Sequence, residues 1–139
     1  MSRAALAGSA AALALGTGLA GCGGEARDLF LVQRSGSIPG ARLSLRVTDD
    51  GRASCNRRPL VDITSGQLID AREAERDLEP LAERGVRLPP GPDSILRYSV
   101  RLEAGTVRFS DTSGHQPPVF LRVAALTRRI ARGPCGLRR

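Results

Sequence analysis

The chain has 139 residues and a formal net charge of +7, with 21 basic residues against 14 acidic ones and a single histidine. Every basic residue is arginine, which is typical of the codon usage of a GC-rich genome, so the charge alone does not indicate nucleic-acid binding. A zinc site needs three or four ligands, and one histidine with three cysteines is too small a set to predict one.

Residues 1–21 are organised as a secretory signal peptide, in which Arg3 precedes an apolar stretch over residues 4–15. That stretch is shorter than the ~20 apolar residues of a membrane-spanning helix. Leu19-Ala20-Gly21-Cys22 then resembles the bacterial lipobox. The resemblance implies cleavage before Cys22, which would carry diacylglyceryl and acyl groups such as palmitate and hold a lipoprotein at the extracytoplasmic face of the cell membrane. The alternative is an ordinary secreted protein with a cysteine near its cleavage site.

With Cys22 assigned to lipid, Cys55 and Cys135 remain as a pair. Two cysteines in an oxidising compartment usually form a disulfide. The loop that this bridge would close contains about 80 residues, which predicts a stabilisation of roughly 4 kcal/mol in the chain-entropy model. The alternative is two free thiols.

The first half of the mature chain predicts a tether over residues 22–28 and then three strands. The apolar run 29–33 indicates a buried strand, and residues 35–40 have the composition of a turn. Leu43, Leu45 and Val47 alternate with polar residues, which favours a half-buried strand. Asp49-Asp50-Gly51 is a hairpin signal, so we expect the return strand at 52–56, with Cys55 on the sheet.

A helix is predicted to begin at Ser65, because Thr64 and Gln67 have the spacing of a capping box. One apolar stripe follows at steps of three and four, formed by Leu68, Ala71, Ala74, Leu78 and Leu81. We expect Pro80 to break or kink this helix and Gly85 to end it. The proline-rich segment 88–92 predicts a stiff, extended connector.

The last third predicts a hairpin and a second helix. Residues 96–103 and 107–110 alternate apolar and polar side chains, as in two strands. A two-residue loop at Ala104-Gly105 would set Leu102 opposite Val107 and Arg101 opposite Arg108. Pro117-Pro118 starts a helix that Gly133-Pro134 stops. The buried face of this helix should comprise Val119, Val123, Leu126 and Ile130.

These elements form a single domain over residues 29–139. Hairpins with helices on one face predict an α+β two-layer sandwich with an antiparallel sheet of about five strands and two helices.

Candidate catalytic groups are few. Ser110, Asp111, Ser113 and His115 are residue types of a hydrolytic triad, but triad members normally converge from separate segments, so a polar loop is the simpler interpretation. Asp70, Glu73 and Asp77 could suggest a carboxylate pair, yet their helical spacing with interleaved arginines favours a solvated face with ion pairs. We therefore predict neither catalysis nor a cofactor.

The strand pattern predicts a basic face of the sheet that points away from the helices. It would serve as a docking surface for an acidic partner or for lipid headgroups, or it is simply the solvated face of a lysine-free protein. Its candidate residues are Arg42, Arg46, Arg97, Arg101 and Arg108.

Several segments together resemble the emfourin-like family, whose namesake is a proteinaceous inhibitor of thermolysin-type metalloproteases. They are Arg34-Ser35-Gly36 with its turn, the acidic and Arg-rich helix ending near Gly85, Pro92-Asp93 leading to Tyr98 and a Gly-turned hairpin, and Pro117-Pro118 with its closing helix. The resemblance implies a small α+β fold and protease inhibition. Two rigid loops would then supply the contacts, through Ser35, Gly36, Ile38 and Pro39 and through Pro89, Pro90, Pro92 and Asp93.

The sequence thus favours a membrane-anchored, non-catalytic binding module whose partner is an extracellular protease or another envelope protein, and not nucleic acid. The alternative is an envelope structural protein whose arginine face binds anionic lipid or wall polymer.

Overall fold

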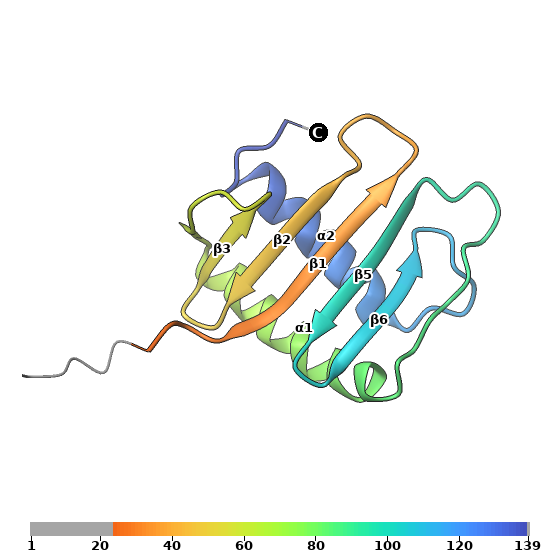
Figure 1. The fold of residues 1–139 in the computed structure, drawn as a ribbon, viewed down its shortest axis with the longest axis horizontal. Helices are drawn as coiled ribbons and strands as arrows, with labels where there is room; N and C mark the ends of the chain where they lie inside the picture. Colours follow the sequence, from red (N-terminus) through yellow and green to blue (C-terminus); the bar gives the residue numbers. More distant parts are fainter. Residues whose placement is uncertain (1–23, 139) are drawn as a thin grey trace, which may run out of the picture.

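A computed structural model describes residues 24–138. The expected signal peptide and its Cys22 lie outside the described residues. The described part forms one six-stranded antiparallel sheet in the order β4-β3-β2-β1-β5-β6 (Figure 1). The strands are β1 Asp28–Gly36, β2 Leu43–Thr48, β3 Arg52–Cys55, β4 Val61–Asp62, β5 Leu96–Leu102 and β6 Gly105–Ser110.

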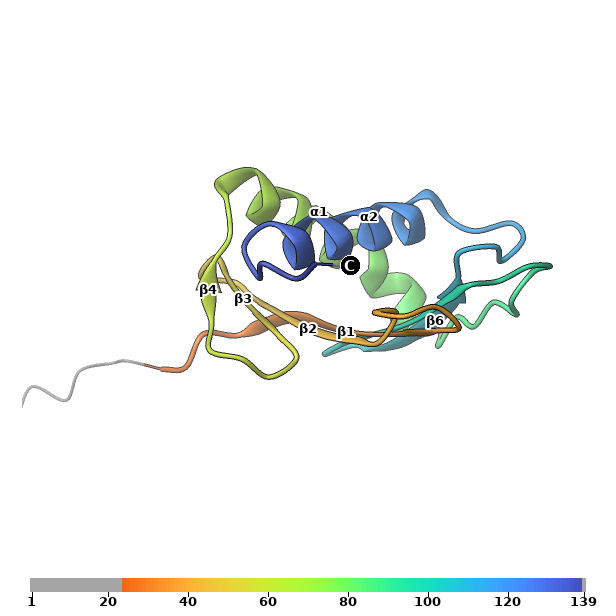
Figure 2. The ribbon, with the colours of Figure 1, turned by 90° about the horizontal axis from the view of Figure 1, so that it is seen from above.

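Both helices, α1 Ser65–Glu83 and α2 Pro118–Arg132, lie on one face of the sheet (Figure 2). The predicted α+β two-layer fold is confirmed. The sheet has one strand more than expected, because β4 is only two residues long and pairs with β3. An alternating pattern cannot be recognised in so short a segment. Neither helix of the described chain is long and apolar enough to cross a bilayer.

The core lies between the two layers and is built from the strand residues that alternate toward the helices. Phe30, Val32, Leu45 and Val100 are buried among them. Three aromatic rings form a stack through the core, with ring centroids 5.0 Å apart for Tyr98 and Phe109 and 4.4 Å apart for Phe109 and Phe120. All four predicted core residues of α2 are buried, and Phe120 beside them is buried as well.

The central strand β1 is longer than the apolar run 29–33 predicted, extending from Asp28 to Gly36. It pairs with β2 on one side and with β5 on the other. Polar residues at its end, including Arg34 and Ser35, therefore remain extended because backbone hydrogen bonds hold them on one or both sides.

The capping box at the start of α1 is confirmed, since the Thr64 hydroxyl accepts from the Gln67 backbone N–H and the Gln67 side chain accepts from the Thr64 N–H. The expected break at Pro80 is wrong. The helix continues through Pro80 to Glu83. Pro80 is exposed, so water can solvate the carbonyl that loses its helical partner.

The expected register of the second hairpin is also wrong. The two-residue turn is Glu103-Ala104, and Leu102 pairs with Gly105, which begins β6. Gly105 has φ +148°, and a Cβ there would meet the Ala82 carbonyl oxygen at 2.3 Å. Glycine is therefore needed at this position because the backbone of α1 approaches β6 closely there, and not because the turn requires it. Arg101 consequently faces Thr106, not Arg108.

The predicted cysteine pair is present. Cys55 at the end of β3 and Cys135 after α2 lie at disulfide distance, with Cα atoms 6.1 Å apart. The bridge joins the sheet to the helical layer.

Candidate functional site

The face of the sheet opposite the helices carries no second layer in the described chain (Figure 2). Its floor consists of polar side chains on β1, β2 and β5, namely Gln33, Ser35, Ser44 and Ser99. The predicted arginines lie around this floor.

Strand pairing arranges these side chains in rows that run across the sheet. In one row Gln33 lies between Ser44 and Ser99, and Ser99 faces Arg108. In the next row Ser35 faces Arg97, while Arg42 immediately precedes β2 on the other side. Because neighbouring strands are about 4.8 Å apart, Arg42 and Arg97 are separated by two strand widths, or about 10 Å.

Arg42, Arg97 and Arg108 line a hollow of about 670 Å³ above this floor. We call it the arginine hollow. All three arginines are exposed, and Gln33, Ser35 and Ser99 also line it. The rest of the lining comprises the half-buried Arg34, Ser110 and the apolar or aromatic residues Leu88, Pro90, Tyr98 and Phe109, and no acidic side chain. The hollow therefore combines guanidinium groups with hydroxyl, amide and apolar groups and attracts negative charge.

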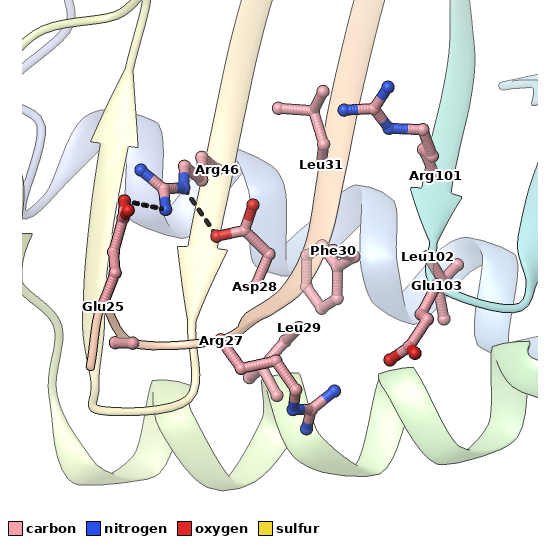
Figure 3. A pocket seen from close by; sticks show the side chains of 11 residues that line it. Glu25, Arg27, Asp28, Leu29, Phe30, Leu31, Arg46, Arg101, Leu102 and Glu103 are labelled. Carbon is pink, nitrogen blue, oxygen red and sulfur yellow. Dashed lines mark hydrogen bonds and ion pairs between the residues drawn. The ribbon is translucent and has the colours of Figure 1, made fainter.

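The remaining two predicted arginines lie near the start of β1. The Arg46 Nε donates to the Asp28 carboxylate over 2.6 Å, and its Nη2 donates to Glu25 over 3.0 Å (Figure 3). These bonds, Asp28 first, raise the pKa of Arg46. Arg101 lines a second hollow of about 470 Å³ together with Glu103. The five predicted arginines therefore do not form one uniform basic face, since Arg46 is paired with acids.

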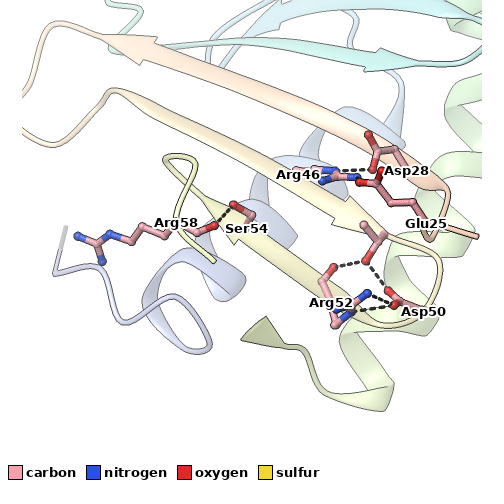
Figure 4. A network of polar contacts seen from close by, with 8 residues as sticks. Glu25, Asp28, Arg46, Asp50, Arg52, Ser54 and Arg58 are labelled. Atoms are coloured by element: carbon pink, nitrogen blue, oxygen red, sulfur yellow. Dashed lines mark hydrogen bonds and ion pairs between the residues drawn. The ribbon is translucent and has the colours of Figure 1, made fainter. Parts of the chain in front are cut away.

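The loop after β3 borders the open face. The sequence pattern did not predict that this loop would bond to the polar face of the sheet. The Ser54 hydroxyl, on the open face, donates to the Arg58 carbonyl and is thereby buried (Figure 4). The Asn56 side chain accepts from the Ser44 N–H, while Asn56 and Arg57 have positive φ values of 53° and 61°. Asparagine favours this left-handed conformation, so Asn56 was the one residue from which the shape of this loop could have been predicted.

The two predicted binding loops lie side by side at the far end of β1, and we call residues 36–42 and 89–95 together the tip. The Ser37 N–H donates to the Ile95 carbonyl over 3.2 Å. A Cβ on Gly36 would meet that same carbonyl at 2.2 Å, so the loops touch through their backbones. Ile38 and Ile95 are 49% and 44% exposed, and they give the tip two apolar side chains in solvent.

Two side chains that were not predicted as site residues hold the tip in place. The Arg34 guanidinium donates to the carbonyls of Ala41 and Gly40 over 2.8 and 3.1 Å. The Asp111 carboxylate accepts from the N–H groups of Ile95 and Leu96 and from the Ser94 hydroxyl. Each of these loops is therefore anchored by a charged group, and little conformational entropy remains to be lost on binding.

Ser110, Asp111 and Ser113, which were considered above as members of a hydrolytic triad, form structural hydrogen bonds instead. Asp111 binds residues 94–96, and the Ser110 and Ser113 hydroxyls lie 3.2 Å apart and are buried. No hydrogen bond in the described chain joins the His115 side chain to either. The acids of α1 form ion pairs with α2, Asp70 with Arg129 and Asp77 with Arg122. No group of three metal-ligating side chains occurs between residues 24 and 138.

The start of the described chain is fastened to the domain. The Arg27 guanidinium donates to Glu75 of α1 over 2.5 Å and lies 3.7 Å from the Asp49 carboxylate. Glu25 is bound to Arg46. We call this region, where β1 begins, the tether end.

Comparison of the chain with protein-family models, with curated proteins and with solved structures found no match.

Proposed function

We propose that this protein is an extracytoplasmic lipoprotein, anchored in the cell membrane through Cys22, whose domain is a non-catalytic binding module for an anionic partner. The observation that carries the proposal is the arginine hollow. Arg42, Arg97 and Arg108 converge there around a polar floor that has no acidic side chain.

Electrostatics support an anionic partner. Guanidinium groups recognise carboxylates and phosphates through paired hydrogen bonds. Arg46, by contrast, already has two acidic partners within the protein. The three arginines of the hollow have no ion pair among the described residues, so they can exchange water for a bound anion.

Binding to an anionic surface tests the proposal. The lipidated full chain, reconstituted in neutral phosphatidylcholine vesicles, is mixed with carboxymethyl-cellulose beads between low and physiological ionic strength. Replacing Arg42, Arg97 and Arg108 together by Gln should abolish vesicle capture. The matched control replaces Arg76, Arg84 and Arg132, exposed arginines of the helical layer, and should retain it. Equal capture of both triple variants would refute the role of the hollow.

The anchor has its own test. Changing Cys22→Ala should release the protein from the membrane fraction and end its labelling with fatty acid. Labelling that persists in this variant would contradict the lipoprotein assignment.

A second candidate function, inhibition of a thermolysin-type metalloprotease, is favoured by the geometry of the tip. The first loop implied by the emfourin-like resemblance binds through Ser37 to Ile95, two residues past the second implied loop at 88–93, and both Ile38 and Ile95 are exposed. A rigid pair of loops with apolar side chains fits the cleft of a protease. The full chain should then inhibit thermolysin at micromolar concentration, and Ile38→Asp with Ile95→Asp should remove the inhibition. Absence of inhibition by the unaltered chain would exclude this function.

A further inference from the structure

From the layout of the arginine hollow we infer that its ligand is an acidic polysaccharide, bound away from the protein's own bilayer. The inference rests on the proposed function and names the partner class. Its first support is the floor of the hollow. Ser35 lies beside Arg97, and Gln33 and Ser99 form the next row of the floor, in which Ser99 lies beside Arg108.

The floor side chains can bind hydroxyl groups. The Gln33 amide nitrogen donates to the Ser44 hydroxyl over 3.0 Å, which leaves its amide oxygen and its second N–H for a ligand. The Ser35 and Ser99 hydroxyls donate and accept. The backbones that carry Arg42 and Arg97 are about two strand widths, or ~10 Å, apart, so a ligand that spans the hollow meets guanidinium groups and hydroxyl groups together. A sugar chain with carboxylate groups supplies a partner for each, acid and hydroxyl.

The hollow lacks one feature that is common in phosphate sites. Such sites often use the N-terminus of a helix or a nest of backbone N–H groups. Both helices lie on the opposite face of the sheet (Figure 2), so neither N-terminus opens onto the hollow. Guanidinium forks bind carboxylates and phosphates alike, so the choice of a carboxylated sugar polymer rests on the hydroxyl-binding floor.

The charge of the tether end argues against the protein's own bilayer as the ligand. Acidic side chains outnumber arginines there, seven to five, so this end keeps a small net negative charge that anionic headgroups would repel. The acids are Glu25, Asp28, Asp49, Asp50, Glu75, Glu79 and Glu103, and the arginines are Arg27, Arg46, Arg52, Arg72 and Arg101.

The proposed anchor is tied to that same end by the chain. Glu25 is bound to Arg46, and only two residues stand between it and Cys22, so Cys22 can be at most about 10 Å from Glu25. The nine residues of β1 extend about 30 Å from the tether end, which exceeds the ~8 Å screening length of physiological salt. Arg42 and Arg97, at the far end of β1, are therefore directed toward polymer beyond the headgroups.

The experiment uses the lipidated full chain in phosphatidylcholine vesicles and measures co-flotation of labelled polymers at physiological ionic strength. Polygalacturonate carries carboxylates and hydroxyls, whereas polyacrylate carries carboxylates alone. We expect Gln33→Ala with Ser99→Ala to weaken polygalacturonate binding about ten-fold, the effect of losing one or two net hydrogen bonds. The same variant should bind polyacrylate as tightly as the unaltered chain does. Unchanged polyacrylate binding would also show that the variant is folded.

Three outcomes would overturn the inference while leaving the proposed function intact. Polygalacturonate binding that is insensitive to the Gln33 and Ser99 substitutions would show attraction by charge alone. Tighter arginine-dependent binding of polyphosphate would show a phosphate ligand. Arginine-dependent capture of separate phosphatidylglycerol vesicles without polygalacturonate binding would show a headgroup ligand. The proposed binding of an anionic partner itself fails if the Arg42, Arg97 and Arg108 triple variant binds every anionic probe as the unaltered chain does.

Discussion

Cys55, the last residue of β3, is joined to Cys135, which follows α2, across a separation of 80 residues. Cys55 is buried within the core cluster, and Cys135 packs against that cluster. The bridge therefore ties the helical layer to one side of the sheet.

Removing this bridge should lower the free energy of unfolding by about 4 kcal/mol, because a longer closed loop restricts the unfolded chain more strongly. The variant is Cys55→Ser with Cys135→Ser, compared in urea unfolding with the unaltered chain before and after reduction. Reduction should lower the urea midpoint of the unaltered chain and leave that of the variant unchanged. Coincident unfolding curves for the oxidised and reduced chain would contradict the prediction.

Gly105→Ala should destabilise the domain by more than about 1 kcal/mol. The new Cβ would meet the Ala82 carbonyl oxygen at 2.3 Å, and the φ of +148° is unfavourable for alanine. Gly114→Ala is the matched control, since a Cβ there has no heavy atom within 4 Å, and it should change stability little. Thermal unfolding followed by circular dichroism distinguishes the two, and equal melting temperatures would refute the steric argument.

Gly105 also shows what could not be predicted from the sequence, namely the exact register of the second hairpin. Alternation placed β5 and β6 correctly, but a glycine next to a predicted turn was assigned to that turn. Its actual reason is the approach of Ala82, a residue 23 positions earlier in the chain. Local patterns carry no information about such a contact. Pro80 is a similar case, because its tolerance depends on its exposure in the folded domain.

The candidate site could also be predicted only in part, because some of its contacts join segments that are distant in the sequence. Alternation along β2, β5 and β6 predicted which arginines leave the core. It could not show that Arg46 is paired with Asp28 and Glu25, since the tether lies against β2 only in the folded chain. The hydrogen-bonding of Arg34 and Asp111 to the tip likewise depends on loops that are distant in sequence.

Thr64→Ala should lower the free energy of unfolding by about 1 kcal/mol, the typical effect of losing an N-cap side chain. Thr64 accepts from the Gln67 N–H over 3.1 Å, and the Gln67 side chain accepts from the Thr64 N–H over 2.9 Å. Thr64→Ser keeps the accepting hydroxyl and should stay close to the unaltered chain in chemical denaturation. Similar losses in both variants would show that the capping bond contributes little.

The turn between β2 and β3 should lose stability at acidic pH. Arg52 and then Thr48 lower the pKa of Asp50 below its ordinary value of 3.8 through hydrogen bonds. Because the folded pKa is the lower one, this stabilisation is present above the unfolded pKa and is lost as the pH falls through the folded value. Asp50→Asn should therefore be less stable than the unaltered chain at neutral pH, and the difference should shrink as the pH falls below the ordinary carboxyl pKa of 3.8. A difference in urea midpoint that is independent of pH would contradict this assignment.

The contacts of the tether end predict how the domain of the proposed lipoprotein stands on a membrane. Arg27 binds Glu75, and Glu25 binds Arg46, so the chain leaves the domain beside the start of β1. A fluorophore attached through Asp50→Cys at the tether end should be quenched by brominated lipid, whereas one attached through Ile38→Cys at the tip should not, since β1 spans about 30 Å between them. Arg27→Gln with Glu25→Gln releases the tether and should reduce the contrast between the two positions. Equal quenching in the unaltered background would mean that the open face lies flat on the bilayer, with the arginine hollow against the headgroups.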